Sequence, residues 1–108
     1  MATEQVNAFG RNLVGIREAC GWTRAVLIDH LTVDMNRFDR RRVRALVWLA
    51  EERHQRRSRL IEPLSQVFGI PAKALANDDL SAETLDSLRE RFGFDRGEVV
   101  ERATKFSL

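Results

Sequence analysis

Apolar residues recur at steps of three and four along almost the whole sequence, and no segment alternates apolar with polar residues. Such steps place side chains on one face of a helix, whereas a half-buried strand needs alternation. The pattern therefore predicts an all-α protein. The chain has 108 residues, 44% of them hydrophobic, which suffices for one core domain with or without a helical appendage.

The first half of the chain predicts three helices. The first covers residues 3–20 and stops at Gly21, and Thr23 caps a second that begins at Arg24. After an irregular stretch from Thr32 to Phe38, Asp39 is expected to cap a third helix that ends near Glu52. The expected inward residues are Val6, Phe9, Leu13, Ile16 and Cys20 in the first helix, Leu27, Ile28 and Leu31 in the second, and Val43, Leu46, Val47 and Ala50 in the third.

Prolines, glycines and capping residues divide the rest of the chain into four shorter helices. A proline is tolerated in the first turn, so the fourth helix is expected from about Glu62 to Gly69, and Pro71 opens a fifth through Leu75. Ser81 is expected to cap a sixth helix, and Asp95 and Glu98 form a capping box for a seventh. Their expected inward residues are Leu64, Val67, Phe68, Leu85, Leu88, Phe92, Val99, Val100, Ala103 and Phe106.

One stretch of the sequence is echoed 72 residues later. Residues 16–24, IREACGWTR, align with residues 88–96, LRERFGFDR. In both copies a helix ends in glycine and an aromatic residue, and a capping residue then starts a second helix, which is the pattern of two helices meeting at a tight turn. A duplicated motif and two independent Gly-stopped helix pairs both account for the echo; a duplicated copy would serve packing or dimerisation.

Basic residues are concentrated in one central segment. The net charge is +2 overall, but it is −1 over residues 1–36, +6 over residues 37–59 and −3 over residues 60–108. Arginine outnumbers lysine by 16 to 2, and its planar fork of donors suits phosphates and guanine edges. A GC-rich genome would explain the excess of arginine but not its clustering.

Projecting the third helix at about 100° per residue places Arg41, Ala45 and Trp48 opposite the apolar face. Arg42 and Arg44 lie on the two flanks, and Arg37 and Arg40 precede or open the helix at its N-terminal end. This arrangement predicts a helix that enters the DNA major groove, with small Ala45 allowing close approach. The alternatives are a solvated face with salt bridges for the arginines, and a core position or dimer contact for Trp48. The predicted contacts from this region are Arg37, Arg40, Arg41, Arg42, Arg44, Ala45 and Trp48, followed by a basic loop with Arg53, Arg56 and Arg57.

Two stretches resemble lambda-repressor-like (XRE-family) regulators. Residues 9–31 carry the Ile16-Arg17-Glu18 step, Gly21, an apolar residue and a Thr cap, and residues 64–75 resemble the fourth helix and the turn into a fifth. The resemblance implies a compact bundle of about five helices of helix-turn-helix type. It implies that residues 40–52 are the recognition helix and that Thr23 and Arg24 meet a phosphate.

We therefore expect residues 1–77 to form a helix-turn-helix DNA-binding domain and residues 78–108 a helical extension that serves dimerisation. The expected function is a sequence-specific transcription regulator, of the repressor type, that binds double-stranded DNA as a homodimer. Two alternatives stay open: a protein-interaction module of antitoxin or adaptor type, and a nonspecific nucleoid-associated DNA binder.

Signals for other classes of protein are missing from the sequence. The only histidines, His30 and His54, have no metal-ligand spacing, and no glycine loop or nucleophile–base pair indicates an enzyme or a cofactor. Cys20 is the only cysteine, no apolar run approaches the length of a membrane span, and the first residues do not resemble a signal peptide. We expect a cytoplasmic protein that has no membrane partner and is not an enzyme.

Overall fold

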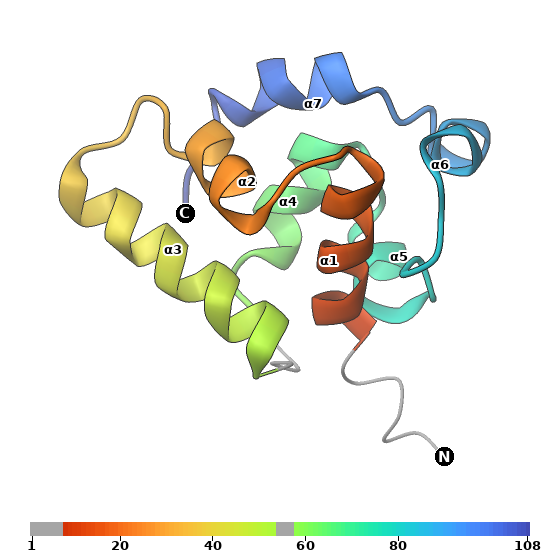
Figure 1. The fold of residues 1–108 in the computed structure, drawn as a ribbon, viewed down its shortest axis with the longest axis horizontal. Helices are drawn as coiled ribbons and strands as arrows, with labels where there is room; N and C mark the ends of the chain where they lie inside the picture. Colours follow the sequence, from red (N-terminus) through yellow and green to blue (C-terminus); the bar gives the residue numbers. More distant parts are fainter. Residues whose placement is uncertain (1–7, 54–57) are drawn as a thin grey trace.

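The computed structural model describes residues 8–53 and 58–108, and all regular structure in these residues is helical (Figure 1). This confirms the predicted all-α class. The predicted start of the first helix at residue 3, and Val6, lie outside the described residues. The helices are α1 (Ala8–Ala19), α2 (Arg24–Leu31), α3 (Arg37–Glu52), α4 (Ile61–Phe68), α5 (Ala72–Asn77), α6 (Leu85–Phe92) and α7 (Arg96–Ala103).

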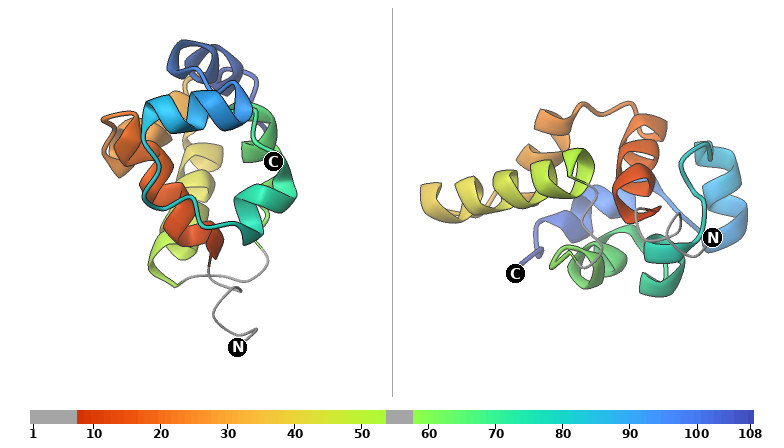
Figure 2. Two further views of the ribbon diagram at one scale, coloured as in Figure 1. Left: turned by 90° about the vertical axis from the view of Figure 1, so that its right-hand side faces the viewer. Right: turned by 90° about the horizontal axis from the view of Figure 1, so that it is seen from below.

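The helices surround one apolar core. α1 packs against α3 on one side and α5 on the other, α4 packs against α5 and α7, and α2 lies on α3 and α7. Nearly all the predicted inward side chains are buried in this core, while Leu46, Leu85, Phe92 and Val100 are only half-buried. The first turns of α3 extend beyond the rest of the molecule (Figure 2, right). None of the helices in the described residues is long and apolar enough to cross a bilayer.

Two helices begin at residues other than those predicted. α3 begins at Arg37, and its cap is Asn36, whose side-chain oxygen accepts from the Asp39 N–H at 2.9 Å. Asp39 therefore lies inside the first turn. α6 is capped by Thr84 in a reciprocal capping box with Ser87, whereas Ser81 donates to Asp79 in the preceding turn. In both cases two residues that can cap a helix stand three positions apart. The cap is the one whose side-chain oxygen accepts from the backbone N–H three residues further along.

The two halves of the sequence echo have the same local structure. Gly21 and Gly93 follow α1 and α6 with φ of 77° and 70°, values that favour glycine. Thr23 caps α2 by accepting from the Val26 N–H, and Asp95 caps α7 by accepting from the Glu98 N–H. The predicted glycine stops and the Thr23 and Asp95 caps are confirmed. The predicted capping box at α7 is only half present in the described residues, because the Glu98 side chain accepts no hydrogen bond from the Asp95 N–H. The two helix pairs also touch, because an Arg96 guanidinium nitrogen donates to the Cys20 carbonyl at 3.0 Å.

The segment from residue 78 onwards packs into the same core as the rest of the chain. Phe94 lies against Phe68 of α4 with ring centroids 6.3 Å apart, and Arg102 of α7 donates to the Val67 carbonyl at 2.8 Å. Its remaining core residues are Leu80, Leu88, Val99, Ala103 and Phe106. The segment therefore completes the core by burying its own apolar side chains there, and its role in dimerisation stays a prediction.

Residues 78–81 are held against α1 by two close contacts. The buried Asn12 side chain donates to the carbonyls of Leu75 and Asp78, at 2.8 and 2.7 Å, and accepts from the Leu80 N–H at 2.8 Å. One turn further along α1, Gly15 faces the backbone of Ser81, and a Cβ on Gly15 would lie 2.5 Å from the Ser81 carbonyl oxygen. The connection between α5 and α6 thus passes directly over α1.

Candidate nucleic-acid interface

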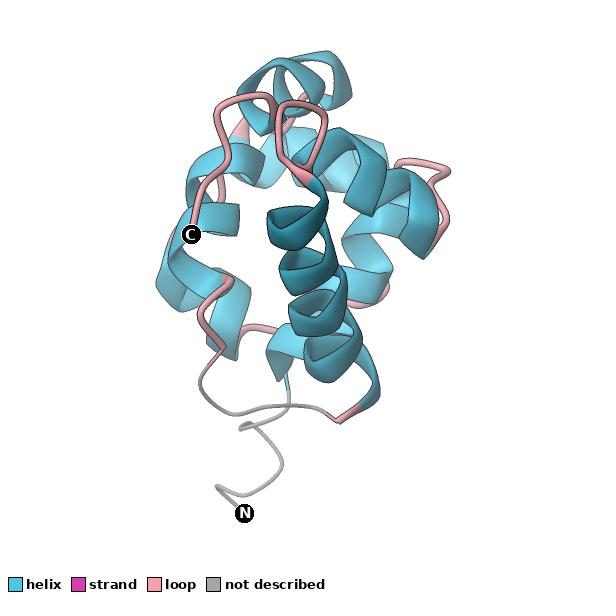
Figure 3. Cartoon of the chain, turned by 90° about the vertical axis from the view of Figure 1, so that its left-hand side faces the viewer, coloured by secondary structure: helices cyan, strands magenta, loops and turns pink. Residues whose placement is uncertain are grey.

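One face of α3 anchors this helix to the core. Val43, Val47 and Ala50 have no exposed surface, and Leu46 packs beside them. These are the four residues predicted to face inward, so the predicted rotation of the helix about its axis is confirmed. Its 16 residues make the helix about 24 Å long. Figure 3 shows α3 at the outer surface, with no other helix in front of it.

The surface of α3 that is turned away from the core carries exposed arginines. In residues 8–53 and 58–108, no acidic side chain forms a salt bridge with any of the five guanidinium groups in the first half of the helix. Ala45 is also exposed, in the middle of this face. Salt bridges within the described chain therefore do not neutralise this face. The five arginines are Arg37, Arg40, Arg41, Arg42 and Arg44, all exposed.

Trp48 lies on the same face, near the end of α3, with 42% of its surface exposed. This exposure excludes the alternative of a core residue. The Arg53 guanidinium lies 5.6 Å from the centre of its ring, within cation–π distance. Trp48 also lines a groove between α2 and α3, whose other lining residues are Arg24, Ala25, Ile28, Asp29 and Arg44.

A buried carboxylate holds α3 in this orientation. The side chain of Glu51 is 1% exposed and accepts hydrogen bonds from Arg17 of α1 and Arg24 of α2. The Arg24 Nε lies 2.8 Å from its Oε1. A buried charge is tolerated only when it is paired and hydrogen-bonded, and here two guanidinium groups provide that pairing. The last turn of α3 is therefore joined to both preceding helices.

Arg24 and Thr23 have contacts within the protein. Arg24 also binds the exposed carboxylate of Glu52, and this hydrogen bond raises the pKa of Arg24 above its ordinary value. The Thr23 hydroxyl oxygen accepts from the Val26 N–H at 3.2 Å. Both residues, predicted to meet a phosphate, thus lie at the start of α2 beside the end of α3, and the guanidinium of Arg24 points at acidic groups.

Two residues that shape this surface were not among the predicted site residues. Phe38 was placed in an irregular stretch but lies in the first turn of α3 with 74% of its surface exposed. The sequence signal for this earlier helix start is Asn36, a capping residue, followed three residues later by Asp39, an acidic residue suited to the first turn. Glu51 was assigned no partner, and no sequence signal links it to Arg17. Arg56 and Arg57, predicted to follow the DNA backbone, lie outside the described residues.

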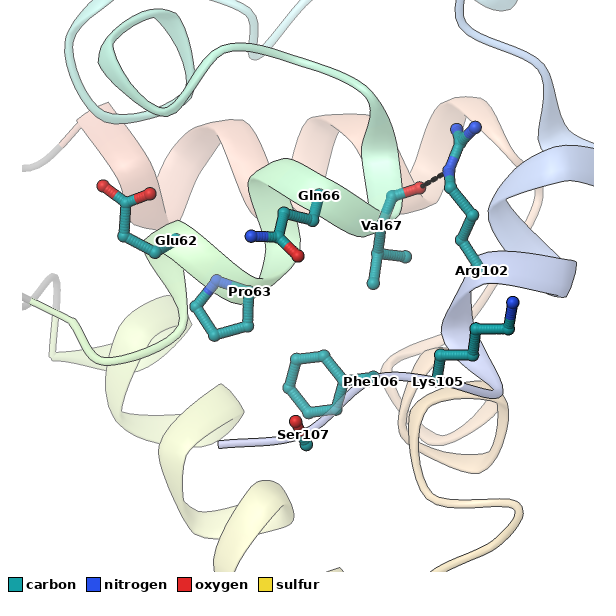
Figure 4. Close-up of a pocket in the computed structure, with 8 residues that line it drawn as sticks. All are labelled: Glu62, Pro63, Gln66, Val67, Arg102, Lys105, Phe106 and Ser107. Carbon is teal, nitrogen blue, oxygen red and sulfur yellow. Dashed lines mark hydrogen bonds between the residues drawn. The ribbon is translucent and has the colours of Figure 1, made fainter.

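The described residues also line a cavity that includes no residue of α3. The cavity, of about 420 Å³, lies between α4 and α7 (Figure 4). Arg102, one of the two cationic residues that line it, already donates to the Val67 carbonyl. Among the described residues, no group of three or more His, Cys, Asp or Glu side chains could hold a metal ion. The residues around the cavity are Glu62, Pro63, Gln66, Val67, Arg102, Lys105, Phe106 and Ser107.

Comparisons with protein families, with curated proteins and with solved structures found no match to this chain.

Proposed function

We propose that this chain is a sequence-specific DNA-binding regulator of the helix-turn-helix type, with α3 as its recognition helix. One observation carries the proposal: five exposed arginines, none salt-bridged within the described residues, lie on one protruding helix whose opposite face is anchored in the core. A surface of this kind has a strong positive potential and attracts a polyanion.

The shape of the surface supports double-stranded DNA as the partner. An α-helix with its side chains is about as wide as the major groove, and no other helix lies in front of the outer side of α3 (Figure 3). Arg41 and Ala45 lie on this side, so guanidinium donors can reach base edges where the small side chain lets the helix approach. Arg37 and Arg40, at the protruding end, are suited to phosphates.

A homodimer is part of the proposal. One helix of this length contacts only a few base pairs, and two-fold symmetry supplies a second recognition helix for a neighbouring half-site. We therefore propose a pseudo-palindromic operator. The oligomeric state is tested by light scattering with and without the selected duplex.

The proposal is tested by selecting bound sites from a random pool of duplexes and titrating the selected site by fluorescence anisotropy. The double variant Arg41→Ala/Arg44→Ala should lose the preference for the selected site over a scrambled duplex. The slope of log K against log salt should become flatter by up to about 2, because two phosphate or base contacts are removed. The matched control is Arg11→Ala/Arg89→Ala, which removes two exposed arginines from α1 and α6 and should keep the preference.

The same titration separates the alternatives. A nonspecific DNA binder would show the salt dependence with no preference for any duplex. A protein-interaction module would leave both duplexes unbound at about 150 mM salt. Equal binding of the selected site by the wild-type protein and Arg41→Ala/Arg44→Ala would refute α3 as the recognition helix.

A further inference from the structure

Phe38 is the most exposed large apolar side chain in the described residues. Its exposed fraction is 74%, against 56% for Val33 and 42% for Trp48. Phenylalanine is usually buried, and an exposed aromatic ring next to charged groups is typical of a contact site. The ring lies in the first turn of α3, at the end that extends beyond the body of the molecule.

The neighbours of Phe38 restrict what can cover it. Arg37 precedes it, and Arg41 and Arg42 follow at the three- and four-residue steps that share a helix face. No guanidinium stacks on its ring in the described residues, where cation–π pairs involve only Trp48 and Phe92. A partner must therefore present an apolar group to the ring and negative charge to the arginines on either side.

A second copy of this chain paired symmetrically through Phe38 does not meet that requirement. Pairing two copies through Phe38 would bring two sets of arginines together, and like charges placed face to face are repulsive. The DNA major groove does meet it, because phosphates border the groove and the 5-methyl group of each thymine is exposed on its floor. Residues in the first turns of a recognition helix are also those that contact base edges.

We infer that Phe38 is a base-contacting residue that packs against the 5-methyl group of a thymine, so that each half-site requires a thymine under the first turn of α3. The inference rests on the proposed function, because it needs α3 in the major groove. Phe38 then distinguishes thymine from bases without a methyl group, while the arginines supply charge and hydrogen bonds.

Replacing thymine by uracil tests this contact, because uracil lacks only the 5-methyl group. Each thymine of the selected site is replaced in turn, and binding is measured for the wild-type protein and for Phe38→Ala. At one thymine per half-site the wild-type affinity should fall about fourfold, the effect of losing one buried methyl group. Phe38→Ala should bind the thymine and uracil forms of that position equally. Because the side chain is exposed, the variant should keep the wild-type melting temperature.

The control variant is Val33→Ala, which removes exposed apolar surface from the connection before α3 and should keep the full uracil effect. A selected site without thymine, or a uracil effect that persists in Phe38→Ala, would overturn the inference while leaving DNA binding intact. If selection yields no preferred site, equal binding to alternating dA·dT and dA·dU duplexes overturns it as well. Failure to bind any duplex would instead refute the proposed function.

Discussion

The guanidinium of Arg17 holds both carboxylate oxygens of Glu51, with Nε 3.0 Å from Oε2 and Nη2 3.0 Å from Oε1. Arg17 belongs to α1 and Glu51 to the last turn of α3, 34 residues later. Because Arg24 of α2 binds the same carboxylate, three helices meet at one side chain. This cluster, together with the apolar face, sets the direction in which the exposed arginines of α3 point.

Replacing Glu51 with glutamine should lower the free energy of unfolding by about 3 kcal/mol. Arg17, whose side chain is only 12% exposed, loses its carboxylate partner, and Arg24 keeps only Glu52. Urea denaturation followed by circular dichroism measures the change. The matched control is Glu52→Gln at the neighbouring position, where the side chain is 48% exposed and the loss should stay below about 1 kcal/mol. Equal losses in the two variants would contradict the role of Glu51.

The control variant Glu52→Gln has an expected effect of its own on DNA binding. Glu52 is an acidic group near the outward face of α3 and holds the Arg24 guanidinium. Its neutralisation should raise the affinity for duplex DNA about threefold, since it removes repulsion from phosphates and leaves the Arg24 guanidinium with one carboxylate partner, Glu51, instead of two. Anisotropy titration checks this against Glu90→Gln, an identical change on the surface of α6, which should have little effect. Unchanged binding by Glu52→Gln, as in Glu90→Gln, would place this end of α3 away from the DNA.

Gly15→Ala should destabilise the protein by about 2 kcal/mol or more, because its Cβ would meet three backbone atoms of Ser81 within 2.8 Å. Backbone atoms cannot move aside without displacing the connection to α6. Gly97→Ala is the comparison, since the only close neighbour there is the exposed carboxylate of Asp95, at 3.2 Å. Thermal melts of both variants should show a much larger decrease for Gly15→Ala, and similar melting temperatures would disprove the close approach.

Asn12→Asp should cost about 3 kcal/mol of unfolding free energy. A carboxylate can still accept from the Leu80 N–H, but it cannot donate to the carbonyls of Leu75 and Asp78. Asn77→Asp makes the same chemical change at an exposed position in α5 and should cost far less. Chemical denaturation of the two variants measures the difference, and a neutral Asn12→Asp would show that these three hydrogen bonds do not hold the connection.

Cys20 should make stability depend on alkaline pH. Burial raises the pKa of its thiol to about 11, although the nearby Arg96 acts in the opposite direction. In the unfolded chain the thiol ionises near its ordinary pKa of 9.0, so the stabilisation is complete below that pH and is lost as pH rises towards 11. The loss amounts to at most about 3 kcal/mol.

The measurement compares urea denaturation of the wild-type protein and Cys20→Ala at about pH 8 and about pH 10.5, on either side of the thiol's range in unfolded chains. Other titrating groups are common to both proteins, so the difference between the two pH dependences isolates the thiol. Parallel pH dependences would show that Cys20 ionises in the folded protein as it does in the unfolded chain.

The sequence predicted the helices well because helix formation depends on near neighbours. The inward residues of α3, the stop at Gly21 and the Thr23 cap all follow from spacings of a few positions. The errors, at Asp39 and Ser81, occurred where two capping residues stand close together, since spacing alone does not rank them. The exposure of Phe38 was missed for the same reason, because placing the helix start three residues late assigned it to a loop.

By itself, the sequence determined that the protein is helical, where most helices begin and end, and which face of α3 is apolar, because all of these follow from interactions within a turn or two of helix. Only the tertiary structure decided which charges are paired. Arg17 and Arg24 precede Glu51 by 34 and 27 residues, and the three side chains meet because the core brings three helices together. The same packing leaves the arginines of α3 facing solvent. Pairs of charges so far apart in the sequence produce no periodic pattern, so the sequence alone does not show which charges pair.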